Sequence, residues 1–371
     1  MSEDHLGFPE EPDADPRPGR GRRRRTGRRN RRRKRILIGV AAGMAFVLLL
    51  AGGVAWWVYD RLDGNIKTED FAAKLGDKGR PLPTGALNVL LVGTDTREGE
   101  NAAYGSDGGG SQRSDTTILL HVPEGRRNAL GVSFPRDLMV DVPACQKPGG
   151  GMSEPYFGMF NSAMTVGGTA CTISTVEHLT GVRVDHQITV DFVGFKKLVD
   201  ALGGVPIHLD QPIDDQAARL NVPAGDVTLN GEQALGFVRV RKSLGDGSDI
   251  QRIQRQQLFL NAMIAKVKKE SLLSNPARMY NILDTATKAI TTDPALGSLS
   301  DLYGLLSSLR NIPESAVAFE TVPITAYQRD PNRVAMVRPE ADVLFARLRD
   351  ESAAVLPSPG ASGREPAANG P

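Results

Sequence analysis

The sequence contains few of the residues on which many catalytic and metal sites depend. Only 2 cysteines and 5 histidines occur among its 371 residues. Neither Cys145 nor Cys171 has a cysteine or histidine neighbour at the spacing of a zinc site, and the histidines are scattered. This composition argues against a zinc site built from cysteine and histidine.

Several familiar catalytic motifs are also absent. The chain has neither the P-loop of nucleotide-binding proteins nor the HExxH helix of metalloproteases. The segment from Gly131 to Pro135 reads GVSFP, so it lacks the last glycine of a nucleophile elbow. No serine has an obvious histidine partner. These absences disfavour P-loop phosphoryl transfer, zinc proteolysis and serine hydrolysis.

Charge is distributed very unevenly along the chain. Residues 1–35 carry 13 basic and 6 acidic side chains, residues 36–59 carry none, and the rest has a net charge of −5. The 24-residue uncharged run is long enough to span a bilayer, and Trp56, Trp57 and Tyr59 suit its outer interface. Because arginines precede this run and no small-residue cleavage site follows it, we predict an uncleaved signal anchor with a cytoplasmic N-terminus.

The arginine-rich tail and the two cysteines each allow two interpretations. A basic tail can bind nucleic acid, but its position directly before a membrane span favours a topology signal that contacts anionic lipids. We therefore predict a membrane partner and no nucleic acid. Outside the cytoplasm, a lone pair of cysteines favours a disulfide between Cys145 and Cys171, with two buried free thiols as the alternative.

The composition divides the chain into five segments. We predict a disordered basic cytoplasmic tail (1–35), a transmembrane signal anchor (36–59), an extracytoplasmic stalk (60–84), a folded catalytic domain (85–350) and a disordered C-terminal tail (351–371). Within the stalk, a short helix is expected around residues 70–75.

The predicted domain alternates strands with helices, which favours an α/β sheet covered on both faces. Strands are expected at 87–92, 117–122, 128–134, 184–190, 205–209 and 317–322. Helices are expected at 169–179, 192–202, 276–290 and 299–309, with a short Asn230-capped helix before residue 237 and a loop-rich segment at 143–168.

The stretch from Gly236 to Gln256 is the most informative part of the chain. Residues 237–241 alternate as a strand would, which would place Arg239 and Arg241 on one face. Ser248 and Gln251 then fit a capping box that opens a helix. Its apolar stripe would be Ile253, Leu260, Ile264 and Val267, with Asp249, Arg252 and Arg255 away from it.

Arginine can grip phosphate with two parallel hydrogen bonds, so we interpret this cluster as a pyrophosphate pocket. The simpler alternative is a surface ion pair between Asp249 and Arg252, which would be worth little.

Three predicted strands also have arginine and aspartate at a terminus. Asp95 and Arg97 follow the first strand, Arg113 and Asp115 precede the second, and Arg136 and Asp137 follow the third. Ligands of open α/β sheets bind at such strand ends.

Asp95 and Asp115 could hold Mg²⁺ against a diphosphate, while Asp249 or Asp137 acts as a base on an acceptor hydroxyl. The alternative for Asp95 and Asp115 is local turn bonding to backbone amides.

Together these motifs resemble the LytR-CpsA-Psr family of cell-envelope glycopolymer transferases. The matching pieces span most of residues 86–270, including Asn161 and Gly167-Gly168, in the family's order and after an N-terminal anchor. The resemblance implies a three-layer α/β/α domain with a central mixed sheet. It also implies transfer of a glycopolymer from a polyprenyl-diphosphate carrier onto peptidoglycan, forming a phosphodiester. The two cysteines and the arginine-rich tail suggest an actinobacterial source.

The resemblance also assigns roles to residues. Asp95 and Asp115 would bind Mg²⁺, and Asp249 would assist catalysis together with Arg136, Arg239 and Arg241. The residues that would hold the diphosphate are Arg97, Arg113, Arg136, Arg239, Arg241, Arg252, Arg255 and Gln256.

Three rival functions remain: a polyprenyl-diphosphate hydrolase, a non-catalytic protein that binds the lipid-linked glycan, and a transcriptional attenuator. The glycopolymer also stays open, because teichoic-acid-like, arabinogalactan-like and capsular chains share the diphosphate linkage that these motifs address.

Overall fold

A computed structural model describes residues 25–76, 79–95, 114–240, 249–269 and 276–350. The chain forms two compact units, residues 1–58 and 59–371. The first contains most of α1 (Arg25–Asp63). Residues 33–63 of this helix are long and apolar enough to cross a membrane, which fits the predicted single-pass anchor.

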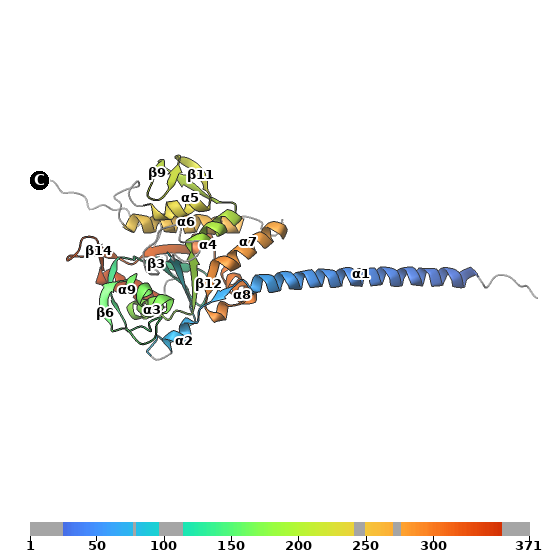
Figure 1. The fold of residues 1–371 in the computed structure, drawn as a ribbon, viewed down its shortest axis with the longest axis horizontal. Coiled ribbons are helices and arrows are strands. Elements are labelled where there is room, and N and C mark those ends of the chain that lie inside the picture. The colour runs from blue at the N-terminus through green and yellow to red at the C-terminus, as the bar shows by residue number, and fades with distance from the viewer. Residues whose placement is uncertain (1–24, 77–78, 96–113, 241–248, 270–275, 351–371) are drawn as a thin grey trace, which may run out of the picture. The chain divides into compact units, whose positions relative to one another are not determined.

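The second unit is built on a seven-stranded mixed sheet with helices on both faces, as predicted (Figure 1). Its strand order is β1-β12-β7-β2-β3-β4-β13. In that order the strands are Lys67–Thr68, Ile290–Thr292, His186–Asp191, Leu87–Thr94, Ser114–Val122, Ala129–Phe134 and Val317–Thr321.

Three smaller sheets extend this framework. One has four strands in the order β14-β15-β5-β6, which are Ile324–Ala326, Val334–Met336, Leu138–Val142 and Tyr156–Met159. The other two are antiparallel pairs, β8 (Val205–Leu209) with β11 (Gly225–Leu229) and β9 (Ile213–Asp215) with β10 (Leu220–Val222). Sequence analysis missed β6, which lies inside the segment predicted to be loop-rich.

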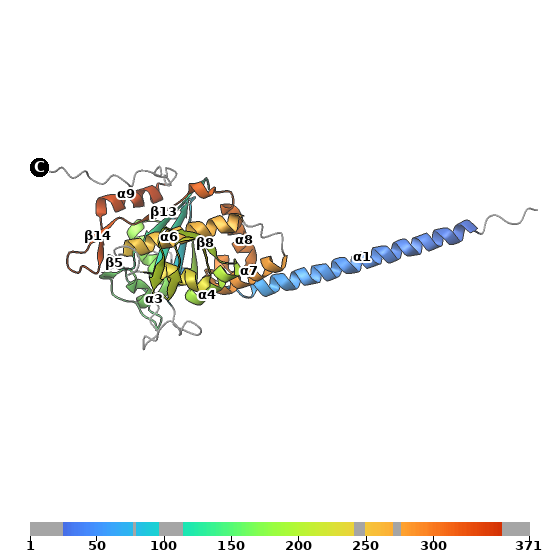
Figure 2. The same ribbon diagram turned by 90° about the horizontal axis from the view of Figure 1, so that it is seen from above.

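The helices bury their apolar faces in two separate cores (Figures 1 and 2). On one side of the sheet, α2 (Phe71–Leu75), α3 (Ser162–Thr180) and α9 (Arg338–Arg349) share a core with β2, β3 and β4. On the other, α4 (Phe192–Ala201), α5 (Gly231–Arg239) and α6 (Asp249–Lys269) pack with the strand pairs. The remaining helical elements are α7 (Pro276–Ala289), η3 (Pro294–Leu296), α8 (Leu299–Leu309) and η4 (Glu314–Ala316).

The strand predicted at residues 237–241 is wrong, because residues up to Arg239 continue helix α5. A capping box starts this helix: Gln233 N–H donates to Asn230 Oδ1 (2.9 Å), and Asn230 N–H donates to Gln233 Oε1 (3.1 Å). Ala234 and Phe237, three residues apart, are both buried. Helical spacing of these apolar residues outweighs the β propensity of the two valines nearby.

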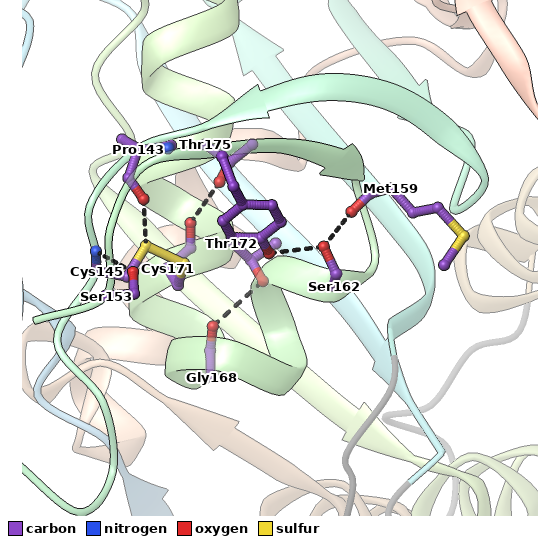
Figure 3. The surroundings of a disulfide bond; sticks show 10 residues. Pro143, Cys145, Ser153, Met159, Ser162, Gly168, Cys171, Thr172 and Thr175 are labelled. Atoms are coloured by element: carbon purple, nitrogen blue, oxygen red, sulfur yellow. Dashed lines mark hydrogen bonds between the residues drawn. A yellow bond between two sulfur atoms is a disulfide. The ribbon is translucent and has the colours of Figure 1, made fainter.

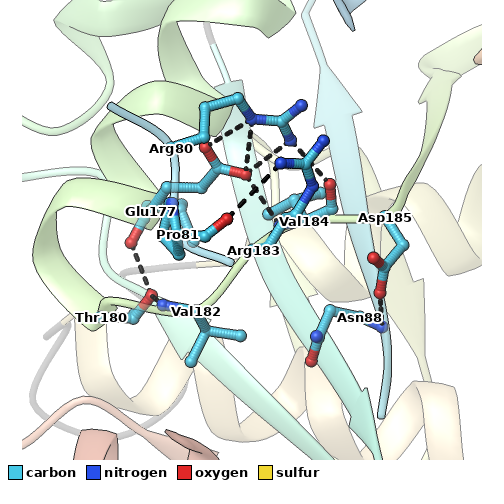
Figure 4. Close-up of polar contacts among 10 residues, drawn as sticks. Arg80, Pro81, Asn88, Glu177, Thr180, Val182, Arg183, Val184 and Asp185 are labelled. Atoms are coloured by element: carbon cyan, nitrogen blue, oxygen red, sulfur yellow. Dashed lines mark hydrogen bonds and ion pairs between the residues drawn. The ribbon is translucent and has the colours of Figure 1, made fainter. Parts of the chain in front are cut away.

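The stalk predicted at residues 60–84 is also wrong as a separate segment, because it packs into the second unit. Strand β1 joins the main sheet beside β12, and Phe71, at 3% exposure, belongs to the core. The short helix expected there is α2, capped by Asp70. Arg80 then donates from Nε (2.9 Å) and Nη2 (2.7 Å) to the Glu177 carboxylate, which also accepts from Val184 N–H (2.8 Å) (Figure 4).

A disulfide joins Cys145 and Cys171, as predicted, and ties the loop after β5 to α3 (Figure 3). Both cysteines are buried. Helix α3 is kinked beside the bond at Gly167 and Gly168, which have non-helical backbone angles. A Cβ on Gly167 would lie only 2.8 Å from Cys171 Cβ, so glycine is required for this close approach.

Replacing both cysteines with alanine is expected to lower the free energy of unfolding by about 3 kcal/mol, because the disulfide closes a loop of 26 residues. Urea unfolding of the wild type and of the double variant, each with and without reductant, measures this. Reductant should weaken the wild type alone. Equal midpoints in all four samples would contradict a stabilising role.

Candidate functional site

The predicted Mg²⁺ ligands lie at one end of the main sheet, where the inner strand β2 ends and β3 begins. We call this row of strand ends the edge of the sheet. Strand β2 runs parallel to β7 and antiparallel to β3. Thr94, the last residue of β2, pairs with both Asp191 and Ser114. Asp95 follows Thr94, and Asp115 follows Ser114, so the two backbones are neighbours although they are 20 positions apart in the sequence.

Asp115 also occupies a β-bulge. Gly93 pairs with Thr116, whereas Thr94 pairs with Ser114, which leaves Asp115 as the extra residue on its strand. Bulges redirect side chains and are frequent beside active sites. The side chain of Asp115 itself lies outside the part of the chain that the structure describes.

Arg239 reaches the same edge from the helical layer. Its guanidinium lies 5.0 Å from the centre of the Phe192 ring, a cation–π contact. Phe192 directly follows Asp191, the residue that pairs with Thr94. Arg239 therefore lies at this edge although it belongs to a helix and not to the predicted strand. The last turn of α5 and the first turn of α4 bring it there.

The first half of α6 connects α5 to the strand ends. Gln256 Nε2 donates to Val238 O (3.3 Å), and Arg255 donates to Val240 O. Gln257 Nε2 donates to Ser133 Oγ (3.1 Å) on β4 and to Thr321 Oγ1 (3.3 Å) on β13. Sequence analysis missed Gln257, whose only signal is its place one residue after the arginine motif.

The predicted apolar stripe of α6 is only partly right. Ile253 is buried, but Val267 is 40% exposed, and Phe259, which was not predicted, is 1% exposed. Arg252 was expected away from the buried face, yet it is only 4% exposed, and Gln256 is 8% exposed. Because Arg252 and Gln256 lie one turn apart, one face of α6 carries polar groups inward near the sheet edge.

Arg255 differs from Arg252 in its surroundings. Together with Gln251, Gln254 and Leu258 it lines a cavity of about 440 Å³, whose far wall includes Phe237 and residues 208–211. Burial lowers the pKa of Arg255, and the charge of Asp215 partly offsets this effect. Arg255 therefore lines a cavity, whereas Arg252 is almost fully buried.

Arg136 and Asp137 follow β4 at the same edge of the sheet. Arg136 Nε lies 3.3 Å from Asp137 Oδ2, and Arg333 Nη1 lies 3.5 Å from Asp137 Oδ1. The backbone N–H of Asn161 donates to Arg136 O (3.0 Å), which joins the start of α3 to this turn. Both carboxylate oxygens of Asp137 therefore already lie near arginine nitrogens.

Some predicted site residues cannot be placed in this way. Arg97, Arg113 and Arg241 lie outside the described residues, as does Ser248 of the predicted capping box. Asp249 begins α6, but its side chain is not among those described. The structure thus brings together the positions of Asp95, Asp115, Arg136, Arg239 and Arg252.

The donor set fits Mg²⁺ bound mainly through water and substrate. Within the described ranges, no three histidine, cysteine, aspartate or glutamate side chains are placed to hold a metal ion. Asp95 and Asp115, whose backbones are neighbours, would therefore supply only part of a coordination shell. Mg²⁺ commonly binds in this way, through one or two carboxylates, several waters and substrate phosphate oxygens.

The fold and this edge define an α/β domain that has arginine and aspartate positions at its strand ends and follows an apolar helix long enough to cross a membrane. The chain belongs to the LytR_cpsA_psr family, whose model matches residues 58–350. This match places residues 60–84 within the family's domain, in agreement with their packing.

Two curated relatives and one solved structure illustrate the similarity. The probable cell wall biosynthesis protein LcpB of Corynebacterium glutamicum is 34% identical over 72% of this chain and 62% of its own length. The polyisoprenyl-teichoic acid–peptidoglycan teichoic acid transferase TagT of Bacillus subtilis is 29% identical over 79% of this chain and 86% of its own. This chain thus spans about three fifths of the corynebacterial protein.

The solved structure of the LytR-Csp2A-Psr enzyme from Actinomyces oris superimposes with a TM-score of 0.57 and 22% identity, covering 76% of this chain and 95% of the other. This likeness supports the α/β fold with its central mixed sheet.

Proposed function

We propose that the chain is a membrane-anchored phosphotransferase that moves a glycopolymer from a polyprenyl-diphosphate carrier onto peptidoglycan. The observation that carries this proposal is the gathering of Asp95, Asp115, Arg136 and Arg239 at one end of the sheet. Family membership and the name of the TagT relative support it. The anchor would hold the catalytic unit on the outer side, with the arginine-rich tail in the cytoplasm.

The arginines would bind the diphosphate and stabilise the charge that develops as the bond breaks. Arg239 and Arg136 approach from opposite sides of the β2–β3 edge, from the helical layer and from the turn after β4. Buried Arg252, with Gln256 and Gln257, would fix that layer against the strand ends. Arg97, Arg113 and Arg241 complete the proposed set by motif, whereas Arg255 would bind from the cavity side of α6.

The reaction exchanges the phosphoanhydride bond of the diphosphate for a phosphate ester. An oxygen of a peptidoglycan hydroxyl attacks the phosphorus that carries the glycopolymer, and the bond from that phosphorus to the bridging oxygen breaks. Polyprenyl monophosphate leaves, a phosphodiester forms, and Asp249 takes the proton of the hydroxyl. Mg²⁺ held by Asp95 and Asp115 would supply positive charge next to the leaving phosphate.

The experiment uses the full chain in vesicles with a polyprenyl-diphosphate-linked saccharide, peptidoglycan oligomers and Mg²⁺. Mass spectrometry should detect saccharide phosphate on the oligomers, with an equal amount of polyprenyl phosphate released. Polyprenyl phosphate without the adduct would indicate a hydrolase. Binding of the lipid without turnover would indicate a non-catalytic carrier, and activity unchanged by a chelator would remove Mg²⁺ from the proposal.

A further inference from the structure

Helix α8 presents large apolar side chains to solvent. Tyr303 is 68% exposed and Leu306 is 63% exposed, whereas Leu302 is buried at 9%. Residues three apart lie on the same face of a helix, so Tyr303 and Leu306 form a single outward patch. Isolated exposed apolar residues are common in proteins, so exposure alone does not indicate a binding surface. The location of the patch in the molecule is the further evidence needed.

The chain itself places this patch near the end of the membrane span. The backbone N–H of Leu299, the first residue of α8, donates to Asp63 Oδ1 at 2.7 Å. Asp63 ends α1, and Leu62 beside it is buried at 2%. Asn65 Nδ2 adds bonds to Asp284 Oδ1 (3.0 Å) and Thr287 Oγ1 (3.3 Å) on α7. The residues directly after the span are therefore fixed to α7 and α8.

A short connection limits how far α8 can lie from the bilayer. Tyr59 would mark the outer interface of the span, and Asp63 lies only four positions after it. Four residues reach at most about 14 Å even when fully extended. The first turn of α8 must therefore lie close to the lipid headgroups, whatever angle the span makes with the second unit.

The charges around α8 also suit a lipid surface. Arg310 directly follows α8. Lys268, at the end of α6, donates from Nζ to the carbonyl oxygen of Ile312, which lies two residues after Arg310. Lys269 is exposed beside Lys268. Asp301 is the acidic residue of the first turn of α8. Basic residues at the end of the helix attract anionic headgroups, while a tyrosine suits the interface between water and acyl chains.

We propose that α8 is a second membrane contact, with Tyr303 and Leu306 inserted among the lipid headgroups of the membrane that holds α1. Strand β12 is antiparallel to β7, so it ends at the end of the sheet away from Asp191, and α8 follows it there. The contact therefore does not occupy the edge that carries the candidate site. With two attachments, the catalytic unit would keep one orientation above the bilayer instead of rotating about a single anchor.

The test uses the full chain in vesicles of phosphatidylethanolamine and phosphatidylglycerol. Both native cysteines are in the disulfide, so one added cysteine can be labelled with a nitroxide. We would compare Leu306→Cys with Val343→Cys on α9, because both native side chains are 63% exposed. Collisions of the label with oxygen, which enters lipid, and with a water-soluble nickel chelate report the surroundings of each position.

The proposal predicts opposite results at the two positions. The label at 306 should collide more with oxygen than with nickel, and the label at 343 should show the reverse. Vesicles of phosphatidylcholine alone should weaken the oxygen preference at 306. Equal nickel access at both positions would overturn the proposal, as would a label at 306 shielded from both reagents, which would indicate a second protein copy on α8. None of these readouts depends on turnover, so they are independent of the transferase proposal.

Discussion

Replacing Arg239 with alanine is expected to lower the rate of glycopolymer transfer roughly 100-fold or more, the usual effect of removing one group that stabilises transition-state charge. Arg239 is held over the Phe192 ring at the edge where β2, β3 and β7 meet. Loss of the cation–π contact should cost only about 0.5–1 kcal/mol of stability, so the variant should remain folded. Initial rates of saccharide-phosphate transfer, together with thermal unfolding, measure both effects.

Two further arginine variants make this prediction specific. Arg239→Lys keeps the charge but loses the planar fork, so its activity should lie between those of wild type and alanine variant. Arg338→Ala removes an exposed arginine of α9 that pairs with Asp342, one turn along the same helix, and should leave the rate unchanged. Wild-type activity in folded Arg239→Ala would remove this residue from the proposed diphosphate site.

The edge formed by β2, β3 and β4 could be predicted because its signals are local. Each strand is an apolar run, and each bears arginine and aspartate at one end. The bulge at Asp115 could not be predicted in this way, because it depends on the register between Gly93 and Thr116, which are distant in the sequence. Register is set by the pairing of the whole strand and by its neighbours on both sides.

The helix α5 shows where a local pattern misled the prediction. Alternating valines and arginines at residues 238–241 favour a strand. The deciding contacts are tertiary, since Ala234 and Phe237 pack with Phe259 of α6 in one core. For the same reason the burial of Arg252 was missed, because this half of α6 packs through Gln257 on strand ends that are distant in sequence.

Residues 60–84 were predicted as a stalk because they are mostly polar. Their attachment depends on partners far along the chain: β12 for β1, and Glu177 for Arg80, 97 residues away. Nothing near Arg80 in the sequence marks it as buried. Long-range ion pairs of this kind become visible only once the fold is known.

Replacing Arg80 with alanine is accordingly expected to lower the free energy of unfolding by about 3–5 kcal/mol, because removal of one partner leaves the other charge buried. The side chains of Arg80 and Glu177 are only 7% and 4% exposed. Arg80 also donates to Val184 O (2.9 Å), in the loop between α3 and β7 (Figure 4). It thus joins the segment before β2 to both α3 and this loop. Chemical denaturation with circular dichroism detection measures the loss.

A charge-removing double variant tests whether the buried charge is the cause. Glu177→Gln keeps an acceptor for the Val184 N–H but removes the carboxylate charge. Arg80→Met with Glu177→Gln should therefore be more stable than Arg80→Ala, by at least about 1 kcal/mol, because no unpaired charge stays buried. Lys74→Ala breaks the exposed pair with Glu69 in the same segment and should cost less than about 1 kcal/mol. If Arg80→Ala were no more costly than Lys74→Ala, the segment would not depend on this ion pair, and β1 and Phe71 alone would hold it to the sheet.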